Sequence, residues 1–528
     1  MVMYYIDRSF KIAYESLSKR YIPKTVASQE KAINLLIESL KGNVTLGGVQ
    51  GPPGTGKTSV VELGTRRIVH DIISSREKIL VIYVAPTNHL VIEAFTRFIA
   101  QLFREGYSIS QVLELVRIYG SRIAACSSKS IKIGDTVVDC NRFKELMSTI
   151  DPNTVRFVFA TEYQRVAPKI TREPDEIRYI VDEASKTPFF RVFLGIAQKI
   201  IRQPEAYYPR SMIVLGDPEQ AITVQEEFRK YRIKLLMYYV RDRLKRLGLE
   251  KHYVFLDTTF RLPAPTEEPI SIGFYEGKLR ALESFYIRYD RYLSSAIGGD
   301  AFNIVRRRLS KLIDIHGSLE TMVVNGIEEA LSSRIPILVF RTKRFPSGDT
   351  YEPLRAKIAF ISSLYLSILS SIAGGGEPLY RVGVTAPYSD LSYSVDYSLK
   401  KVVSEESCRS AFIATTVQAI IGGEADIIVT MLGKEWNPIG LSYGYSIASY
   451  DIYYETMYFR EHQVLNVQLS RHRLLMIMIG DNYLLEKTAK SLESYKPYAK
   501  AGQSISRTME TINDTLYKRG YSKIVDVS

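Results

Sequence analysis

Cysteine is scarce in this chain of 528 residues, which carries only Cys126, Cys140 and Cys408 and no C-x-x-C pair. An odd number of widely spaced cysteines does not suggest a disulfide framework. Zinc domains rich in cysteine and iron–sulfur clusters normally take several cysteine ligands, so the sequence disfavours both. The six histidines are scattered, and we expect them to be ordinary structural or surface residues.

Long apolar runs and a leader sequence are also lacking. We expect no run of apolar residues to be long enough to span a bilayer, and the first residues lack the basic-then-apolar layout of a signal peptide. The sequence therefore predicts a soluble, cytoplasmic protein with no membrane partner. Because 528 residues exceed one hydrophobic core, we expect two large domains plus insertions.

Acidic residues are outnumbered by basic ones, 57 against 70, so the net charge is 70 − 57 = +13 and the pI is near 9.3. A basic surface favours polyanionic partners, although many basic proteins bind no nucleic acid. The 36 tyrosines could supply base-stacking surfaces, but most should be core or ordinary surface residues.

Residues 44–59 predict a short apolar strand, a glycine-rich turn and the start of a helix. The letters GPPGTGKT at 51–58 fit the phosphate-loop pattern G-x-x-x-x-G-K-[ST]. Glycines let backbone N–H groups approach phosphates, and the positive end of the helix dipole points at the same anion. The predicted nucleotide-binding residues are Gly51, Pro53, Gly54, Thr55, Gly56, Lys57, Thr58 and Ser59. Lys57 would reach the β- and γ-phosphates of ATP and Thr58 would ligate Mg²⁺, whereas a hairpin that binds nothing is disfavoured by the strand–loop–helix order.

Further strand–loop–helix units follow and predict a doubly wound α/β sheet. Residues 78–85 form one expected strand, residues 101–154 read as a polar insertion, and residues 156–161 form another strand. The apolar stretch 178–181 then delivers Asp182 and Glu183. After a phosphate loop, such a pair predicts Asp182 as a Mg²⁺ ligand and Glu183 as the group that orients and deprotonates water. The alternative is a strand end with two solvated acids.

The rest of the chain predicts a second α/β domain. We expect a first domain over 1–263 and an accessory helical, basic insertion over 264–335. A second domain over 336–528 would end in a helical tail. The insertion carries basic residues among aromatics, and two interpretations stay open: an accessory helical element or a grip on phosphates. These basic residues are Arg288, Arg291, Arg306, Arg307, Arg308 and Lys311.

The ordered motifs resemble those of superfamily 1 helicases, in the branch of the nonsense-mediated decay helicase and its DNA-processing relatives. The resemblance covers residues 29–481 and is carried, beyond the loop, by residues 85–88, 216–220, 260–263, 422–424 and 465–473. It implies two RecA-like domains, ATP hydrolysis in the cleft between them, and 5′ to 3′ movement along a single strand of nucleic acid.

The resemblance also implies roles for residues outside the loop. Gln29 matches the glutamine that recognises adenine, and Phe260 matches an aromatic residue that packs on the base. Gln220 matches the residue that links the γ-phosphate to the nucleic-acid groove. Arg261 and Arg471 match arginines that contact the γ-phosphate, and Glu424 matches an acid near the ribose. Residues that line the single-strand groove in relatives match Pro86, Thr87, Asn88, Thr161, Pro387, Tyr388 and Thr416.

Some positions depart from the family pattern. Residues 421–423 read Ile-Gly-Gly where Gln-Gly-Arg is usual, Leu391 stands where a glutamine is common, and Ala221 replaces a common leucine. These departures bear on unwinding more than on ATP hydrolysis. We therefore expect a monomeric ATP-dependent helicase or translocase on single-stranded DNA or RNA. The alternatives are an ATP-switched clamp and an ATPase whose partner supplies the activity.

Overall fold

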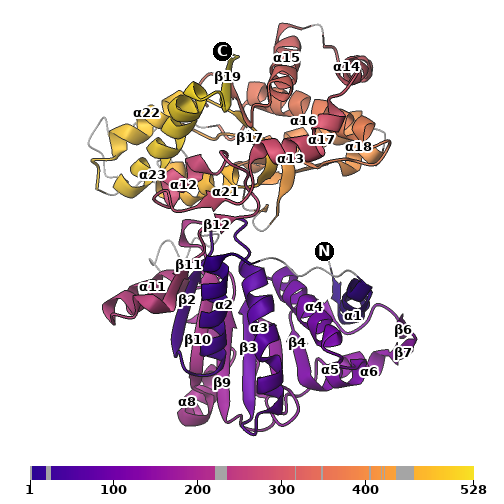
Figure 1. Ribbon diagram of the computed structural model, residues 1–528, viewed down its shortest axis with the longest axis vertical. Coiled ribbons are helices and arrows are strands. Elements are labelled where there is room, and N and C mark those ends of the chain that lie inside the picture. Colours follow the sequence, from indigo (N-terminus) through magenta and orange to yellow (C-terminus); the bar gives the residue numbers. More distant parts are fainter. Residues whose placement is uncertain are drawn as a thin grey trace. The chain divides into compact units, whose positions relative to one another are not determined.

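The computed structural model describes residues 3–18, 25–220, 235–315, 317–346, 349–403, 406–417, 419–420, 423–435, 457–496 and 498–527. The chain divides into two units (Figure 1), described separately below. The first unit comprises Met1–Pro52 and Gly56–Leu256, and the second comprises Pro53–Thr55 and Asp257–Ser528. The predicted domain limits at 263 and 335 stay predictions, and the accessory stretch 264–335 groups with the second unit.

The first unit contains a seven-stranded parallel sheet in the order β11-β2-β10-β9-β3-β8-β4. Its strands are β2 (Leu46–Gln50), β3 (Ile79–Ala85), β4 (Val116–Tyr119), β8 (Phe157–Thr161), β9 (Glu176–Val181), β10 (Pro209–Gly216) and β11 (Tyr253–Phe255). All seven residues of β3 are buried, as expected for a parallel strand covered on both faces.

Helices cover both faces of this sheet. One core contains side chains of α1 (Ile6–Glu15), α2 (Ala27–Leu40), α3 (Lys57–Ser74) and α4 (Asn88–Arg104). The opposite core contains side chains of α7 (Arg191–Leu194), α9 (Pro204–Tyr207) and α11 (Leu236–Arg246). Alternate residues of β3 enter the two cores, with Val81 and Tyr83 in the first and Leu80 and Ile82 in the second. The sheet is therefore doubly wound.

The predicted insertion over 101–154 was wrong at its start. Helix α4 continues to Arg104, α5 (Ile109–Leu115) follows, and β4 belongs to the main sheet as its edge strand. The sequence VRIY of β4 is short, so its apolar alternation gives little signal. The true excursion comprises β5 (Ile123–Ala124), the hairpin of β6 (Ser130–Ile133) and β7 (Thr136–Asp139), and α6 (Cys140–Glu145).

A disulfide closes this excursion, contrary to the expectation from the cysteine count. Cys126 and Cys140 are bonded, with their Cα atoms 5.8 Å apart, while Cys408 is free and buried. The β6–β7 hairpin folds the intervening chain back on itself, which brings together two cysteines that share no sequence motif.

The second unit contains a six-stranded parallel sheet in the order β16-β15-β17-β18-β14-β19. The strands are β14 (Ile337–Arg341), β15 (Val382–Ala386), β16 (Phe412–Thr416), β17 (Ala425–Met431), β18 (His472–Ile479) and β19 (Ser522–Asp526). Strand β18 is buried at every position except Arg473, so both of its faces are covered. The predicted α/β class with two parallel sheets is confirmed, while the assignment of these sheets to the RecA-like kind stays a prediction.

The tail over 486–528 is helical only in part. Helices α22 (Asn482–Leu492) and α23 (Ala499–Glu510) and the π-helical turn Thr511–Leu516 are followed by β19, which pairs with β14. The prediction of a helical tail therefore holds for the helices within 482–516 and is wrong for 522–526. The five residues of β19 are stabilised by their pairing in the sheet, which periodicity over a short segment does not reveal.

One helix contradicts the expectation about apolar runs. In the described part of the chain, α16 (Pro353–Ala373) is long and apolar enough to cross a membrane, with a mean hydropathy of 1.6 over its best window. However, 78% of that window is buried inside the structure, as in the core helix of a folded domain. Its length reflects the width of the core that it covers, which also contains Phe340 and Val384.

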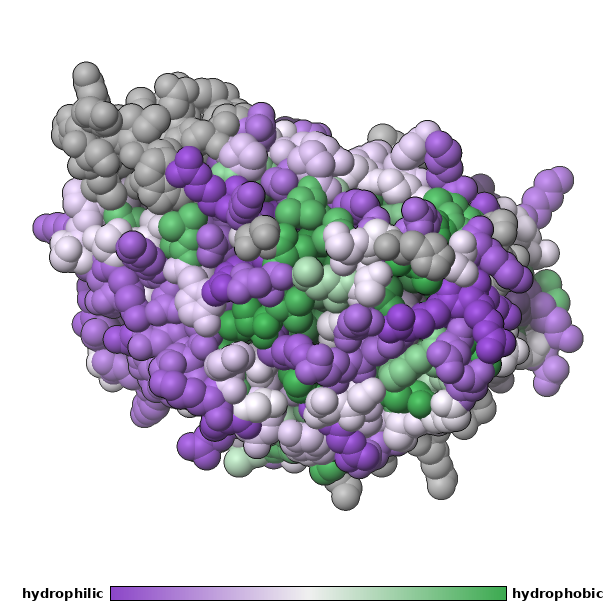
Figure 2. Space-filling view, turned by 90° about the horizontal axis from the view of Figure 1, so that it is seen from above, coloured by the Kyte–Doolittle hydropathy of each residue, from purple (hydrophilic) through white to green (hydrophobic). Residues whose placement is uncertain are grey.

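The basic insertion is an amphipathic helical element of the second unit. It contains α12 (Glu268–Phe274), the short strand β13 (Arg280–Ala281), α13 (Phe285–Tyr292), α14 (Ala301–Leu312) and α15 (Ser318–Ser332). The apolar side chains of the last three helices join the core around α16. Arg306 pairs with Glu328 on α15 rather than projecting freely. The face drawn in Figure 2 mixes hydrophilic residues with small groups of hydrophobic ones, a normal protein surface. These contacts favour the interpretation as an accessory element over a dedicated grip on phosphates.

Candidate nucleotide site

The phosphate loop connects β2 to α3 at the carboxyl end of the sheet. Gly54 and Gly56 have φ values of 69° and 80°, a left-handed conformation that favours glycine. Lys57 opens the 18-residue helix α3, and its Nζ donates to the Gly51 carbonyl at 2.6 Å. The loop therefore places an ammonium and a helix N-terminus together, which is an arrangement that binds anions.

Gln29 lies beside this loop. It is buried in the first turn of α2, where its Oε1 accepts a hydrogen bond from the Val26 N–H at 3.2 Å. A Cβ at Gly56 would lie 2.5 Å from Gln29 Nε2, so the amide packs directly on the loop. Gln29 thus caps α2 and contacts the loop, while its recognition of adenine stays a prediction.

Asp182 and Glu183 follow the last residue of β9, as predicted. Asp182 is buried, its Oδ2 accepts from the Tyr83 hydroxyl at 2.7 Å, and its Oδ1 accepts from the Glu183 N–H at 2.8 Å. Burial and the neighbouring Glu183 raise the pKa of Asp182, while the Tyr83 hydrogen bond and Lys57 oppose the rise. Burial and Asp182 raise the pKa of Tyr83 well above 10, which keeps its phenol a donor.

Glu183 has an unusual backbone conformation. Its φ is +50°, in the left-handed region that residues with a Cβ seldom adopt. Its carboxylate oxygen Oε2 lies 3.2 Å from the Nζ of Lys186. Non-glycine residues held in this region cost free energy and concentrate at functional sites, so the conformation supports a specific task for Glu183.

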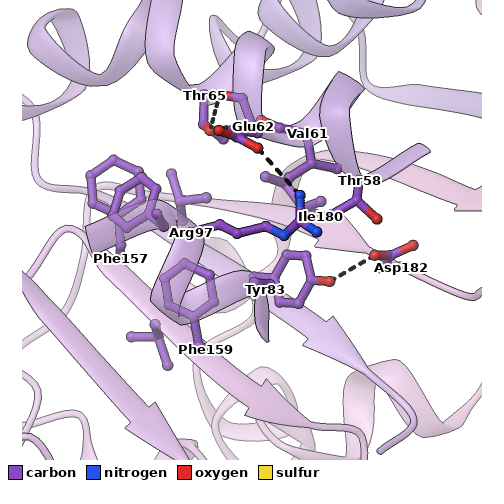
Figure 3. A pocket seen from close by; sticks show the side chains of 14 residues that line it. Thr58, Val61, Glu62, Thr65, Tyr83, Arg97, Phe157, Phe159, Ile180 and Asp182 are labelled. Carbon is purple, nitrogen blue, oxygen red and sulfur yellow. Dashed lines mark hydrogen bonds and ion pairs between the residues drawn. The ribbon is translucent and has the colours of Figure 1, made fainter. Parts of the chain in front are cut away.

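Thr58 and Asp182 border the same pocket (Figure 3), a narrow cavity of about 30 Å³. Most of its wall is apolar and lies between α3, α4 and the sheet, with Phe157, Phe159 and Ile180 among the lining residues. A threonine hydroxyl and a carboxylate fit Mg²⁺, a hard cation that prefers oxygen ligands and keeps several waters. No group of three or more His, Cys, Asp or Glu side chains suited to a metal occurs in the parts of the chain described above.

Gln220 belongs to a buried polar network at the end of β10. Its Nε2 donates to Asp217 Oδ2 at 2.7 Å, and Gln50, the last residue of β2, donates to Asp217 Oδ1 at 3.3 Å. Tyr253 in turn donates to Gln50 Oε1 at 3.1 Å. Asp217 therefore links the predicted Gln220 to the strand that delivers the phosphate loop.

In the second unit, Glu424 pairs with Arg261, one of the two predicted arginines, and with Arg473, which was not predicted. Arg261 Nε lies 2.8 Å from Glu424 Oε2, and Arg473 Nη1 lies 3.4 Å from Glu424 Oε1. Burial alone would raise the pKa of Glu424, but Arg261, Arg473 and Arg471 outweigh it and hold that pKa below its usual value. Arg471 is buried, and its Nε donates to the Val467 carbonyl at 3.0 Å.

The tip of the phosphate loop, Pro53–Thr55, groups with this second unit. Thr259 Oγ1 donates to the Pro53 carbonyl at 2.8 Å, and the Phe260 N–H donates to the Gly54 carbonyl at 2.9 Å. A Cβ at Gly54 would lie 2.3 Å from the Cβ of Arg261. Phe260 and Arg261 are therefore held directly against the loop tip.

The predicted nucleic-acid residues lie at carboxyl ends of neighbouring strands. Pro86, Thr87 and Asn88 follow β3, and Thr161 ends β8, which pairs with β3. In the second unit, Pro387 and Tyr388 follow β15, while Thr416 ends the adjacent β16. Parallel α/β sheets bind ligands at this edge. Among these residues, Thr87 also caps α4 by accepting from the Leu90 N–H at 3.4 Å.

The positions that depart from the family pattern differ in what the structure shows of them. Ile421 and Ala221, which depart from the family pattern, lie outside the described residues. Gly423, a third departure, is described, and its N–H donates to the Ile420 carbonyl at 2.7 Å. Leu391, the other departure, is fully buried in α17 (Ser389–Val402), where it contributes to the core of the second unit.

Four residues of the site were not singled out from the sequence: Tyr83, Asp217, Gln50 and Arg473. Tyr83 lies within an apolar strand, where an aromatic residue reads as core packing. Asp217 lay inside the quoted motif at 216–220, yet only its hydrogen bonds show that it anchors Gln220. A polar side chain at the end of a parallel strand is the signal that could have identified Gln50.

Comparison with known proteins gives one match to a family. A family model described as an AAA domain matches residues 24–188, which contain the loop and both carboxylates. No curated protein matches the sequence at a significant level. Together with the loop and the carboxylates, the family match supports a P-loop nucleotide-binding domain in this part of the chain.

Among solved structures, the chain is similar to a single-substitution variant of Saccharomyces cerevisiae Dbp5 bound to RNA and ADP BeF3. The two share 10% sequence identity with a TM-score of 0.38, and the match covers 97% of each chain. We draw no conclusion from a likeness this weak.

Proposed function

We propose that this chain is an ATP-dependent helicase or translocase that acts on single-stranded nucleic acid. The observation that carries the proposal is the meeting of the phosphate loop with two adjacent carboxylates, the buried Asp182 and the partly buried Glu183, at one edge of the first sheet. Tyr83 fixes Asp182 through a 2.7 Å hydrogen bond, and Glu183 holds a left-handed backbone beside it. A glycine-rich turn without a ligand would need neither feature.

The residues of the first unit would divide the chemistry between them. Backbone N–H groups of the loop and the Lys57 ammonium bind the β- and γ-phosphates. Mg²⁺, held by Thr58 and Asp182, would neutralise phosphate charge. Glu183 accepts a proton from the attacking water, for which its carboxylate must be ionised.

Arginines of the second unit would complete the reaction. Arg261 and Arg471 supply positive charge to the phosphoryl group as negative charge develops in the transition state. Phe260, held at the loop tip by the Gly54 carbonyl, would pack on the base that Gln29 recognises. Glu424 holds Arg261 by an ion pair of 2.8 Å, consistent with a contact near the ribose.

Single-stranded DNA or RNA is the proposed track, with 5′ to 3′ movement inferred from the family resemblance. The residues proposed to contact it lie at the carboxyl ends of β3, β8, β15 and β16. The motif change at 421–423 favours a second candidate, an ATP-switched clamp that binds a strand without displacing its complement.

The deciding experiment measures phosphate release from ATP with no polymer, with single-stranded DNA and with single-stranded RNA. Stimulation by one polymer, together with displacement of a labelled strand, is expected for a motor and names its track. ATP turnover with ATP-dependent binding but no displacement would favour the clamp. No hydrolysis under any condition would overturn the proposal.

A further inference from the structure

Arg288, the fourth residue of helix α13 in the accessory insertion, is buried and lies between two distant segments of the second unit. Its Nη2 donates to the Phe260 carbonyl at 2.7 Å, and its Nη1 donates to the Arg473 carbonyl at 2.8 Å. Nη1 also donates to the Arg261 carbonyl. One guanidinium therefore joins the backbone of 260–261 to that of residue 473.

A carboxylate fixes this guanidinium from its other side. Arg288 Nε lies 2.9 Å from Glu283 Oε2, and Glu283 Oε1 also accepts from Arg291 Nη2 at 2.7 Å. A guanidinium is a planar group with five donors, so it can bond to the carboxylate and to several carbonyls at once. A lysine ammonium carries three donors on one atom and cannot span the same set of acceptors.

The two joined segments carry the arginines that the proposed reaction needs. Arg261 lies in the first segment, and Arg471 lies two residues before Arg473 in the second. Arg261 Nη1 also donates to the Ser470 carbonyl at 3.3 Å, which confirms that the segments are adjacent. The side-chain directions of Arg261 and Arg471 therefore depend on a backbone junction that Arg288 holds.

We propose that Arg288 is a positioning residue for Arg261 and Arg471. This inference rests on the proposed ATP hydrolysis. Arg288 donates to backbone carbonyls and to Glu283, so it would act through the two arginines and not through contact with ATP. The accessory insertion thereby contributes to catalysis by fixing geometry, since small displacements of a transition-state contact are costly.

The test compares Arg288→Met and Arg288→Lys with Arg291→Met in the full chain. Arg291 lies on the same helix and pairs with the same Glu283, but its side chain is half exposed. We expect both Arg288 variants to lower kcat for ATP about 10- to 100-fold with little change in KM, because binding by the loop is intact. Arg291→Met should leave both parameters within about twofold of wild type.

A second measurement tests, without relying on activity, whether Arg288 holds the two backbone segments together. Hydrogen–deuterium exchange at amides 258–262 and 470–474 should become about tenfold faster or more in Arg288→Met than in Arg291→Met. Unchanged exchange at both segments, or equal effects in the control, would overturn the inference. If Arg288→Met does not fold, Arg288→Lys provides the same comparison. A wild-type chain without ATPase activity would refute the proposed function, while the exchange data would still decide whether Arg288 holds the junction.

Discussion

The phosphate loop is built from one continuous stretch of sequence, whereas the arginines around Glu424 and Arg288, here called the arginine junction, are brought together by the fold. The loop is one continuous stretch whose backbone N–H groups and helix start do the binding, so its chemistry is local. The junction assembles Arg261, Arg288, Glu424 and Arg473 from distant segments of the chain, and the contacting residues Arg261 and Ser470 lie 209 positions apart. A local motif is visible in a sequence and fails when a single residue changes. An assembled junction depends on supporting residues that no local pattern identifies.

The largest effect on ATP turnover should follow from changes to the phosphate loop and to the carboxylate beside it. Lys57→Ala and Glu183→Gln should each lower ATP turnover by about 10³-fold or more, because they remove a phosphate contact or the general base. Circular dichroism should show an unchanged fold. Arg66→Ala on the same helix, which loses only a surface ion pair with Glu105, is the control and should keep wild-type turnover. Substantial phosphate release by either Lys57→Ala or Glu183→Gln would contradict the mechanism.

Within the arginine junction, substituting the two arginines that pair with Glu424 should lower kcat by different amounts. Arg261→Met should lower kcat about 10³-fold, the effect expected for an arginine that stabilises the transition state. Arg473→Met should cost less than about tenfold, because its side chain is half exposed and its ion pair with Glu424 is longer, at 3.4 Å. Single-turnover hydrolysis measures both. Equal losses in the two variants would show that Glu424, rather than Arg261 itself, sets the rate.

The carboxylate Asp182 also depends on a residue distant in the sequence, Tyr83. Tyr83→Phe removes the hydroxyl that donates to Asp182 at 2.7 Å while keeping the ring in the core. Loss of a hydrogen bond to a metal ligand typically weakens metal affinity about 10- to 100-fold, so half-maximal ATPase activity should require more Mg²⁺. Tyr119→Phe, which loses a hydroxyl bonded to the Ser148 carbonyl in the same sheet, is the control. An unchanged Mg²⁺ requirement in Tyr83→Phe would refute the role of Tyr83.

The last expected effect is on stability rather than turnover: His472, beside Arg471, should make the stability of the fold depend on pH. Burial, with Arg288 and Arg261, lowers the pKa of His472 to about 3 in the folded chain. Above the ordinary pKa of about 6.5 the histidine is neutral in both states, so its contribution is fully present. Below that value the unfolded chain binds a proton and the folded chain does not. Stability should therefore fall with decreasing pH, by on the order of 1 kcal/mol per pH unit down to about pH 3.

Thermal unfolding of wild type and His472→Gln at pH 7.5, 6 and 4.5 tests this. The variant loses the contact between Nε2 and Thr266 Oγ1, so its melting temperature should be lower at pH 7.5. The difference in melting temperature between wild type and variant should narrow as the pH falls. Only the wild type loses stability through protonation of His472 in the unfolded chain. Melting curves that shift in parallel at all three pH values would show that His472 does not titrate on unfolding.

Much of the fold was predictable, because parallel strands buried on both faces give continuous apolar runs. The strands 78–85 and 178–181 and the phosphate loop all have strong local signals. Strands β4 and β19 are short and depend on a neighbour in the sheet, so periodicity missed them. The pairing of Cys126 with Cys140 required the hairpin between them. The sequence predicted Asp182 and Glu183, whereas the bonds of Tyr83 and Arg288 follow only from tertiary contacts.

The position of β19 has a consequence for how the second unit is made. Asp526 on β19 pairs with Arg341 on β14, a partner 185 positions earlier in the chain. During synthesis, β14 emerges long before β19, so this edge of β14 stays unpaired while the intervening chain is translated. The first unit is complete in sequence by Leu256, apart from the loop tip that waits for residues 259–260. The second sheet therefore keeps one edge open on the ribosome until β19 has been synthesised.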